Sequence, residues 1–251
     1  IPREDSFHEE NNVATEHRAT LSDYRGSGYD RGHMAPNADM PNKAAQFDSF
    51  SLANMVPQAP KNNQQVWREL EEATRALVTK QKLDVFVVTG PVFQGKKLKT
   101  IGQGVIVPSA VYKAVYMPKT GAIGAYYAPN DNSQQVRIVS VCYLEEQLGV
   151  NLFPQLTEEQ KRNTYKLPLT ATAVKANSAI QYSHWDAESQ CAEEVSSEQL
   201  KALQKNFKSS TTQSSSGSTV TKGTGMDAAD QDAIVKQLVD ALLQYILQLL
   251  R

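Results

Sequence analysis

The stretch YDRGHMAP, residues 29–36, places an acid, an arginine, a glycine and a histidine in unbroken succession. It follows the turn-like RGSG at residues 25–28, so His33 lies among turns and small residues rather than inside an apolar run. A single histidine is more often structural or solvent-exposed than reactive. Here, however, Arg31 supplies a guanidinium that can bind a phosphate group, and an imidazole with a near-neutral pKa can take a proton from water. The stretch therefore makes His33 the first candidate for chemistry.

A second pattern follows in residues 51–77, SLANMVPQAPKNNQQVWRELEEATRAL. Two prolines punctuate a loop, and a helix is predicted to begin near Asn62 or Asn63. Residues four apart drift only ~40° around a helix, so one stripe should carry four of these side chains: Asn63, Trp67, Glu71 and Arg75. The alternative is a solvated face with a carboxylate–arginine pair worth ~0.3–0.5 kcal/mol. The tryptophan argues against that alternative because indoles are usually partly buried.

Composition and charge limit the class of protein. The 251 residues, 40% of them apolar, suffice for one sizeable domain with appendages or for two small domains. The formal net charge is −1, so any affinity for nucleic acid must come from a local basic patch rather than a bulk field. No stretch approaches ~20 uncharged apolar residues, so no membrane partner is expected. The first residue, Ile1, favours a processed or trimmed chain.

The apolar runs predict an α+β fold. LDVFVVTGPVF at residues 83–93 predicts a central strand that ends at Gly-Pro, and the runs at 103–118 and 121–130 continue in the same way. Residues 135–157 predict a strand followed by a short helix, and the segment after them has the Thr-x-x-Gln form of a capping box. Strands and helices alternate without a regular βαβ rhythm, which favours a mainly antiparallel central sheet flanked by helices.

The composition also divides the chain into three parts. Residues 1–207 are predicted to form the globular part, and residues 208–225 are dominated by Ser, Thr and Gly, which is typical of a flexible linker. Residues 226–251 predict an amphipathic helix with a two-heptad apolar seam. The helix could dock on its own domain, or it could contact a second copy or another partner, which the tether slightly favours. Because Met226 follows the linker directly, the helix could also be an appended module.

The chain has two cysteines. Cys142 lies in an apolar run that predicts a buried strand, where a free thiol would behave as a small apolar residue, whereas Cys191 lies in a polar segment. A disulfide between them is one alternative if the chain is exported, and two free thiols are the other. Two cysteines do not decide between these alternatives.

Together, these stretches resemble the DNA/RNA non-specific endonucleases, the ββα-metal nuclease family. The resemblance rests on DRGHMAP, on NMVPQ…NNQQVWRELE…R and on VVTGPVF, and it covers about residues 1–185. It implies a ββα-metal nuclease fold in the globular part, and an enzyme that hydrolyses phosphodiester bonds of DNA and RNA and leaves 5′-phosphate ends. It also implies a divalent cofactor, normally Mg²⁺, for which Mn²⁺ or another divalent ion can substitute. The linker and the final helix are not part of the resemblance.

The resemblance implies three residues for the chemical step. His33 corresponds to the general base that deprotonates the attacking water. Asn63 corresponds to the only protein ligand of the metal, and Glu71 to a carboxylate that holds water bound to that metal. These roles agree with what the reaction needs, which is an activated water, neutralised phosphate charge and a stabilised departing oxygen. Mg²⁺ in particular keeps several waters and takes few protein ligands.

Four further residues receive supporting roles from the resemblance. Asn54 corresponds to an asparagine whose hydrogen bonds support the surroundings of the catalytic histidine. Arg31 and Arg75 correspond to arginines that bind the scissile phosphate or offset its charge. Arg3 is the candidate for an arginine that the family has near the start of the domain.

Two other functions stay open. The chain could be a nuclease toxin or effector whose final helix binds a partner, or a non-catalytic relative that binds nucleic acid. A promiscuous nuclease endangers its own cell, so a secreted or periplasmic bacterial location is favoured over a mitochondrial one. The remaining histidines have no spaced metal partners, and surface or packing roles are expected for His8, His17 and His184.

Overall fold

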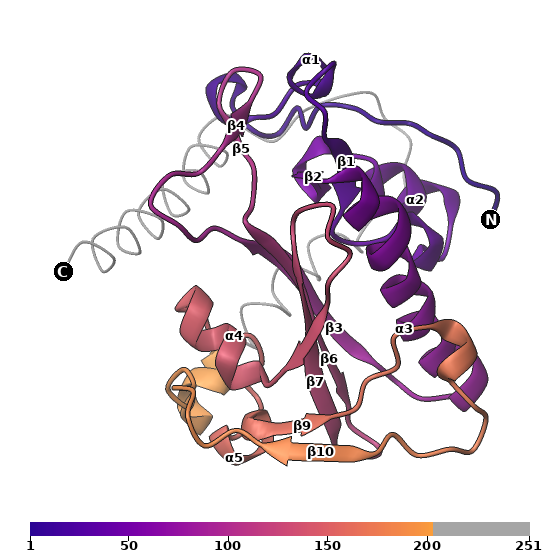
Figure 1. The fold of residues 1–251 in the computed structure, drawn as a ribbon, viewed down its shortest axis with the longest axis vertical. Helices are drawn as coiled ribbons and strands as arrows, with labels where there is room; N and C mark the ends of the chain where they lie inside the picture. The colour runs from indigo at the N-terminus through magenta and orange to yellow at the C-terminus, as the bar shows by residue number, and fades with distance from the viewer. Residues whose placement is uncertain (203–251) are drawn as a thin grey trace, which may run out of the picture. The chain divides into compact units, whose positions relative to one another are not determined.

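An antiparallel sheet of four strands organises the part of the chain that the computed structural model describes, residues 1–202 (Figure 1). β6 (Ala110–Met117) and β7 (Ala122–Pro129) form its middle, and β3 (Phe86–Val92) and β8 (Arg137–Val139) form its edges. The predicted linker and C-terminal helix lie outside the described residues.

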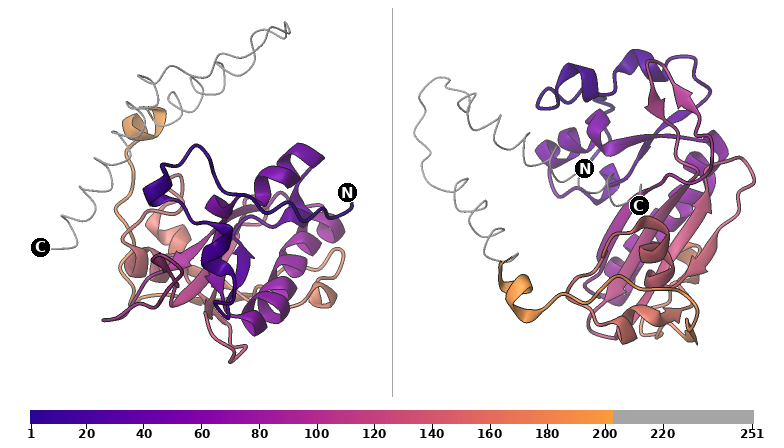
Figure 2. Two further views of the ribbon diagram at one scale, coloured as in Figure 1. Left: turned by 90° about the horizontal axis from the view of Figure 1, so that it is seen from above. Right: turned by 90° about the vertical axis from the view of Figure 1, so that its left-hand side faces the viewer.

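Both faces of this sheet are covered, which explains why its middle strands are apolar without alternation. On one face, Val111 and Val115 pack with Leu70 and Leu77 of α3 (Arg68–Gln81). On the other, Tyr112 and Ala114 pack with residues of α4 (Val141–Leu148) in a second core cluster. The two helices flank the sheet from opposite sides (Figures 1 and 2). The expected α+β class with a mainly antiparallel sheet is confirmed.

The prediction of a central strand at residues 83–93 is wrong in position. β3 pairs only with β6, so it is an edge strand, and it continues through Gly90 and Pro91 instead of ending there. Proline lacks an N–H and is therefore tolerated mainly on sheet edges. Phe86 is 58% exposed, as an edge position allows.

Cys142 lies in a helix, not in the strand that was predicted. β8 ends at Val139, and the Ser140 side chain then accepts a hydrogen bond from the Tyr143 backbone N–H and caps α4. The apolar run would be buried as a strand or as a helix, so its hydrophobic periodicity did not distinguish the two.

The N-terminal part of the chain builds a two-stranded antiparallel sheet beside a helix. β1 (Asp30–His33) pairs antiparallel with β2 (Met55–Gln58). Gly32 is required in this pairing, because a Cβ atom there would lie 1.9 Å from Oε1 of Gln58. The segment around and between the strands contains five short helices: η1 (Thr15–His17), α1 (Leu21–Tyr24), η2 (Asn37–Asp39), α2 (Lys43–Ser49) and η3 (Leu52–Asn54).

The chain then enters the long helix of the ββα unit. After β2 comes η4 (Asn62–Trp67), a segment of π-helix that runs directly into α3. The helix therefore begins where the sequence predicted it.

Smaller elements complete the described chain. A short hairpin of β4 (Thr100–Ile101) and β5 (Val105–Ile106) packs on α1, and α5 (Glu158–Arg162) precedes β9 (Asn163–Tyr165). β9 pairs with β10 (Tyr182–Trp185), and η5 (Ala171–Ala173) lies between them in sequence. The predicted capping box at the start of α5 is confirmed. No helix within residues 1–202 is long and apolar enough to cross a membrane.

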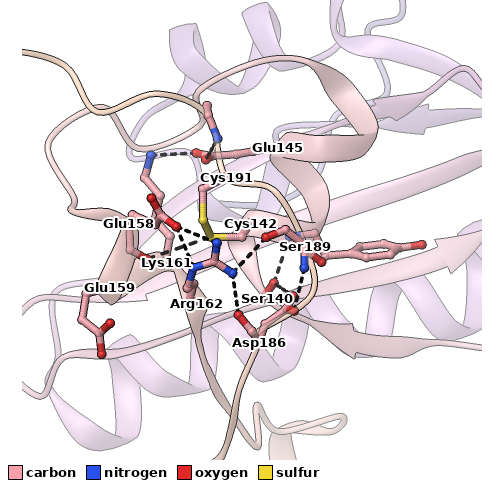
Figure 3. The surroundings of a disulfide bond; sticks show 12 residues. Ser140, Cys142, Glu145, Glu158, Glu159, Lys161, Arg162, Asp186, Ser189 and Cys191 are labelled. Carbon is pink, nitrogen blue, oxygen red and sulfur yellow. Dashed lines mark hydrogen bonds and ion pairs between the residues drawn. A yellow bond between two sulfur atoms is a disulfide. The ribbon is translucent and has the colours of Figure 1, made fainter.

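Residues 186–194, which we name the clasp, fasten the end of the described chain onto α4 and α5 (Figure 3). Cys142 and Cys191 form a disulfide, which resolves the alternative left open by the sequence. Beside it, the fully buried pair of Lys161 and Glu145 has Nζ and Oε1 2.9 Å apart. Glu145 Oε2 also accepts the backbone N–H of Ala192 at 3.0 Å.

Candidate active site

A cleft of about 790 Å³ lies beside β1, bounded by the N-terminal segment, α1 and the helix η4–α3. Its lining is strongly polar and includes four arginines and three acids: Arg3, Arg25, Arg31, Arg68, Asp5, Asp30 and Glu71. His33 and Asn63 line the same cleft. Residues that are far apart in sequence therefore meet around one cavity that can hold an anion.

His33 ends β1 in an aromatic environment. Its ring lies edge-on to Phe50, with centroids 4.8 Å apart, and 5.8 Å from Phe7. The residue is 9% exposed, and its Nε2 is buried without a hydrogen-bond partner among residues 1–202. Burial, assisted by the charge of Arg3 and opposed by that of Asp5, lowers the pKa of His33 to about 4. The imidazole is therefore uncharged at neutral pH and able to accept a proton.

Asn54 does not line the cleft but holds the backbone that follows His33. Its Nδ2 donates to the carbonyls of Ala35 and Ser49 at 2.8 and 2.9 Å, and its Oδ1 accepts the N–H of Ala35 at 3.0 Å. Its own carbonyl accepts the N–H of Met34. These bonds fix the exit of β1 and so the position of the imidazole.

Asn63 is oriented by an acid of the Asp-Arg-Gly-His stretch. Its Nδ2 donates to Asp30 Oδ2 at 2.9 Å, and Gln64 donates to the same oxygen at 2.8 Å. This arrangement assigns the amide nitrogen of Asn63 to Asp30 and leaves Oδ1 as the atom available to a cation. No group of three His, Cys, Asp or Glu residues within residues 1–202 could hold a metal. The donor set therefore fits an ion that takes one neutral protein oxygen and keeps its waters, as Mg²⁺ does.

The predicted stripe of four side chains is only partly correct. Trp67 is buried in the core cluster under α3 and does not line the cleft. The π-helical turns of η4 bond residue i to i+5 and so need more residues per turn than an α-helix. The side chains of this helix that reach the cleft are Asn63, Gln64, Arg68 and Glu71.

Arg75 also departs from the prediction. It does not line the cleft, and its Nε forms an ion pair with Oδ1 of Asp39 in η2. One helical turn beyond Glu71, the arginine is thus occupied by an acid at the edge of the site. The pair is made through Nε, which leaves the two terminal nitrogens of the guanidinium outside it.

Glu71 lines the cleft and is partly buried. Burial raises its pKa to about 7, while the positive charge of Lys113 opposes that shift. Lys113 is itself buried on β6, where its Nζ donates to Thr89 Oγ1 at 3.0 Å and lies 5.2 Å from the centre of the Trp67 ring. The sequence signal for this lysine was its position inside the otherwise apolar run AVYKAVY.

Two arginines predicted from the sequence do line the cleft. The guanidinium of Arg31 lies 3.8 Å from the centre of the Phe7 ring, which supports its flat face. Arg3 forms an exposed ion pair with Asp5, with Nε and Oδ1 2.6 Å apart. Other lining residues were not predicted from the sequence, among them Tyr24, Arg25, Gln64 and Arg68. Arg25 lies just before the stretch at residues 29–36, and Gln64 follows Asn63. Closeness in sequence to these motifs was the feature that could have identified them.

Comparison with known proteins identifies the family to which this chain belongs. The model of the DNA/RNA non-specific endonuclease family matches residues 2–159, and the chain belongs to that family. Mitochondrial endonuclease G of Bos taurus is 40% identical over 138 residues, which are 49% of this chain and 46% of the bovine protein. A nuclease of Nostoc sp. is 36% identical over 157 residues, 56% of each chain.

A solved structure of the EndoG/EndoGI complex is also similar, with a TM-score of 0.55 and 27% identity. The similarity covers 62% of this chain and 71% of the solved one. The chain spans about half the length of the curated relatives that it matches. The family match ends at residue 159, so the clasp lies beyond it.

Proposed function

We propose that the protein is a metal-dependent endonuclease that hydrolyses phosphodiester bonds of both DNA and RNA. The observation that carries this proposal is the meeting of His33 and Asn63 at one arginine-lined cleft. An uncharged imidazole, a free amide oxygen and guanidinium groups are the components that water activation, cation binding and phosphate binding require.

In this proposal His33 takes a proton from the water that attacks phosphorus. Its lowered pKa keeps a ring nitrogen unprotonated at neutral pH, and the packing of Phe7 and Phe50 fixes the ring plane. Arg31, supported by Phe7, and Arg3 neutralise the charge that grows on the phosphate oxygens.

Asn63 Oδ1 would hold the divalent cofactor, which supplies positive charge for the departing oxygen when bound. Asp30 keeps the Asn63 amide in the required orientation. Glu71 contributes a carboxylate to the lining of the cleft, where it can accept hydrogen bonds from water. Mg²⁺ is the favoured ion, Mn²⁺ or another divalent ion is the substitute, and the products carry 5′-phosphates.

The absence of sugar preference follows from what these residues contact. In this proposal the arginine side chains and the imidazole contact the phosphodiester, which DNA and RNA share. Nucleotide sequence, in contrast, is read at base edges. The disulfide further supports a secreted or periplasmic location, because disulfides persist in oxidising compartments.

The test is cleavage of supercoiled plasmid and of total RNA by wild type, His33→Ala and Asn63→Ala, each with Mg²⁺ or with EDTA. We expect wild type to degrade both substrates only with the metal, and each variant to lose most activity. His184→Ala is the matched control, because His184 is exposed on β10. If the wild type cuts neither substrate, or if both active-site variants cut as well as wild type, the proposal is wrong.

A further inference from the structure

Tyr24 is a buried tyrosine whose hydroxyl has no partner. The residue is 7% exposed, and its ring packs with Leu52, Met55 and Ile101 in the core cluster beneath α1. Its hydroxyl oxygen is buried, and no residue within 1–202 bonds to it. Buried polar groups are nearly always hydrogen-bonded, so this exception needs an explanation.

The ring of Tyr24 is held rigidly, so the unpaired hydroxyl is not a sign of a loose side chain. α1 begins with a capping box between Thr20 and Asp23. Asp23 also accepts the backbone N–H of Gln103 at 2.8 Å, which ties α1 to the β4–β5 hairpin. The helix that carries Tyr24 is therefore capped at its start and tied to the neighbouring hairpin.

Tyr24 belongs to the lining of the candidate active site. Tyr24 lines the same cleft as His33 and Arg31, and it interacts electrostatically with the Arg31 guanidinium. Burial raises the pKa of Tyr24 above its ordinary value, so the group keeps its proton and can donate a hydrogen bond. A donor beside a phosphate-binding arginine calls for an anionic oxygen as its acceptor.

We propose that the Tyr24 hydroxyl donates to a non-bridging oxygen of the bound phosphodiester, next to Arg31, and is a substrate-binding group. This inference rests on the proposed function, which supplies the phosphodiester. A neutral donor that contacts the phosphate in both ground and transition states should act mainly on KM.

The test pairs Tyr24→Phe with Tyr126→Phe. The Tyr126 hydroxyl donates to the carbonyl of Pro168 in the core, so it is a buried hydroxyl with a structural partner. We expect Tyr24→Phe to lower kcat/KM about 10-fold to 100-fold, mostly through KM, with Tm unchanged or higher. Tyr126→Phe should show the opposite pattern, with unchanged kcat/KM and a Tm lower by about 2–4 °C.

Binding of a short fluorescein-labelled DNA duplex in EDTA separates this inference from the proposed function. If the wild type binds in EDTA but cuts neither DNA nor RNA with Mg²⁺, and Tyr24→Phe binds about tenfold more weakly, the nuclease proposal fails and the role of Tyr24 stands. The inference is overturned if Tyr24→Phe keeps kcat/KM and Kd within threefold of wild type, or if its Tm falls as far as that of Tyr126→Phe. The same holds if wild type neither cuts nor binds.

Discussion

The cleft and the clasp use similar polar residues in opposite ways. Around the clasp, near α5 at the lower left of Figure 1, buried charges are paired and hydrogen-bonded. Lys161 contacts both Glu145 and Asn151, and Glu145 accepts backbone N–H groups from Leu152 and Ala192. In the cleft, the buried polar atoms of His33 and Tyr24 have no partner within residues 1–202.

The difference separates structural polar groups from those available to a ligand. A satisfied buried network specifies one packing arrangement and contributes nothing further to a reaction. An unsatisfied buried group is unfavourable in the free protein, by about 1–3 kcal/mol, and that energy is recovered when a ligand supplies the missing partner. Substitutions in the cleft should therefore lower activity while leaving stability nearly unchanged. Substitutions in the clasp should lower stability while leaving activity nearly unchanged.

The largest effect is expected at His33. Removing a general base typically lowers the rate by about 10²-fold to 10⁴-fold, so His33→Ala should lower kcat by that factor while the variant still folds. Cleavage rates and circular dichroism measure the two quantities. A variant that is inactive because it is unfolded would contradict the contrast between the two regions.

Breaking the buried ion pair comes next. Lys161→Met leaves Glu145 as an unpaired buried carboxylate, which should lower the free energy of unfolding by about 3–5 kcal/mol without changing the cleavage rate of the folded protein. Urea unfolding at fixed pH measures the loss. The double variant Lys161→Met/Glu145→Leu should recover part of it, and no recovery would mean that the lysine acts through packing alone.

The disulfide should contribute slightly less. It closes a loop with a sequence separation of 49 residues, for which the chain-entropy model gives about 4 kcal/mol as an upper value. Cys142→Ala/Cys191→Ala should therefore unfold at lower urea but cleave at the wild-type rate at low temperature. A loss of activity without a loss of stability would show that the clasp affects the geometry of the cleft.

The smallest effects concern pH, and their signs are opposite for two groups in the cleft. The folded pKa of His33, about 4, lies below the ordinary value of 6.5, so the unfolded chain binds more protons between these values. Its contribution therefore rises with pH from about 4 to 6.5, by up to ~3 kcal/mol. For Glu71 the folded pKa of about 7 lies above 4.5, so its contribution falls as pH rises through that window.

Urea unfolding in EDTA across pH 4–7 tests both signs. Between pH 4.5 and 6.5, where the two windows overlap, the slopes of His33 and Glu71 should oppose each other in wild type. Glu71→Gln should expose the rising slope of His33, and His33→Gln the falling slope of Glu71. If both variants keep the wild-type profile, the two groups are not buried as the structure shows.

The sequence predicted a large share of the site because the motifs are local. The Asp-Arg-Gly-His stretch forms β1, the helix begins at Asn62 as expected, and His33, Asn63 and Glu71 line one cleft. The predictions that were wrong depended on a uniform helical period or on an isolated apolar run. Trp67 turns into the core because η4 is π-helical, and Cys142 lies in α4 because Ser140 caps a helix there.

The sequence by itself determined the residue types that carry the chemistry, the class of fold, and the helix that presents Asn63 and Glu71. These depend on short-range spacing, capping and hydrophobic pattern, which are written along the chain. Only the tertiary structure decided that β3 is an edge strand, that Asp30 orients Asn63 across 33 residues, and that the Tyr24 hydroxyl is buried without a partner. Each of these depends on which atoms from distant segments meet and which are left unpaired, and no local pattern records that.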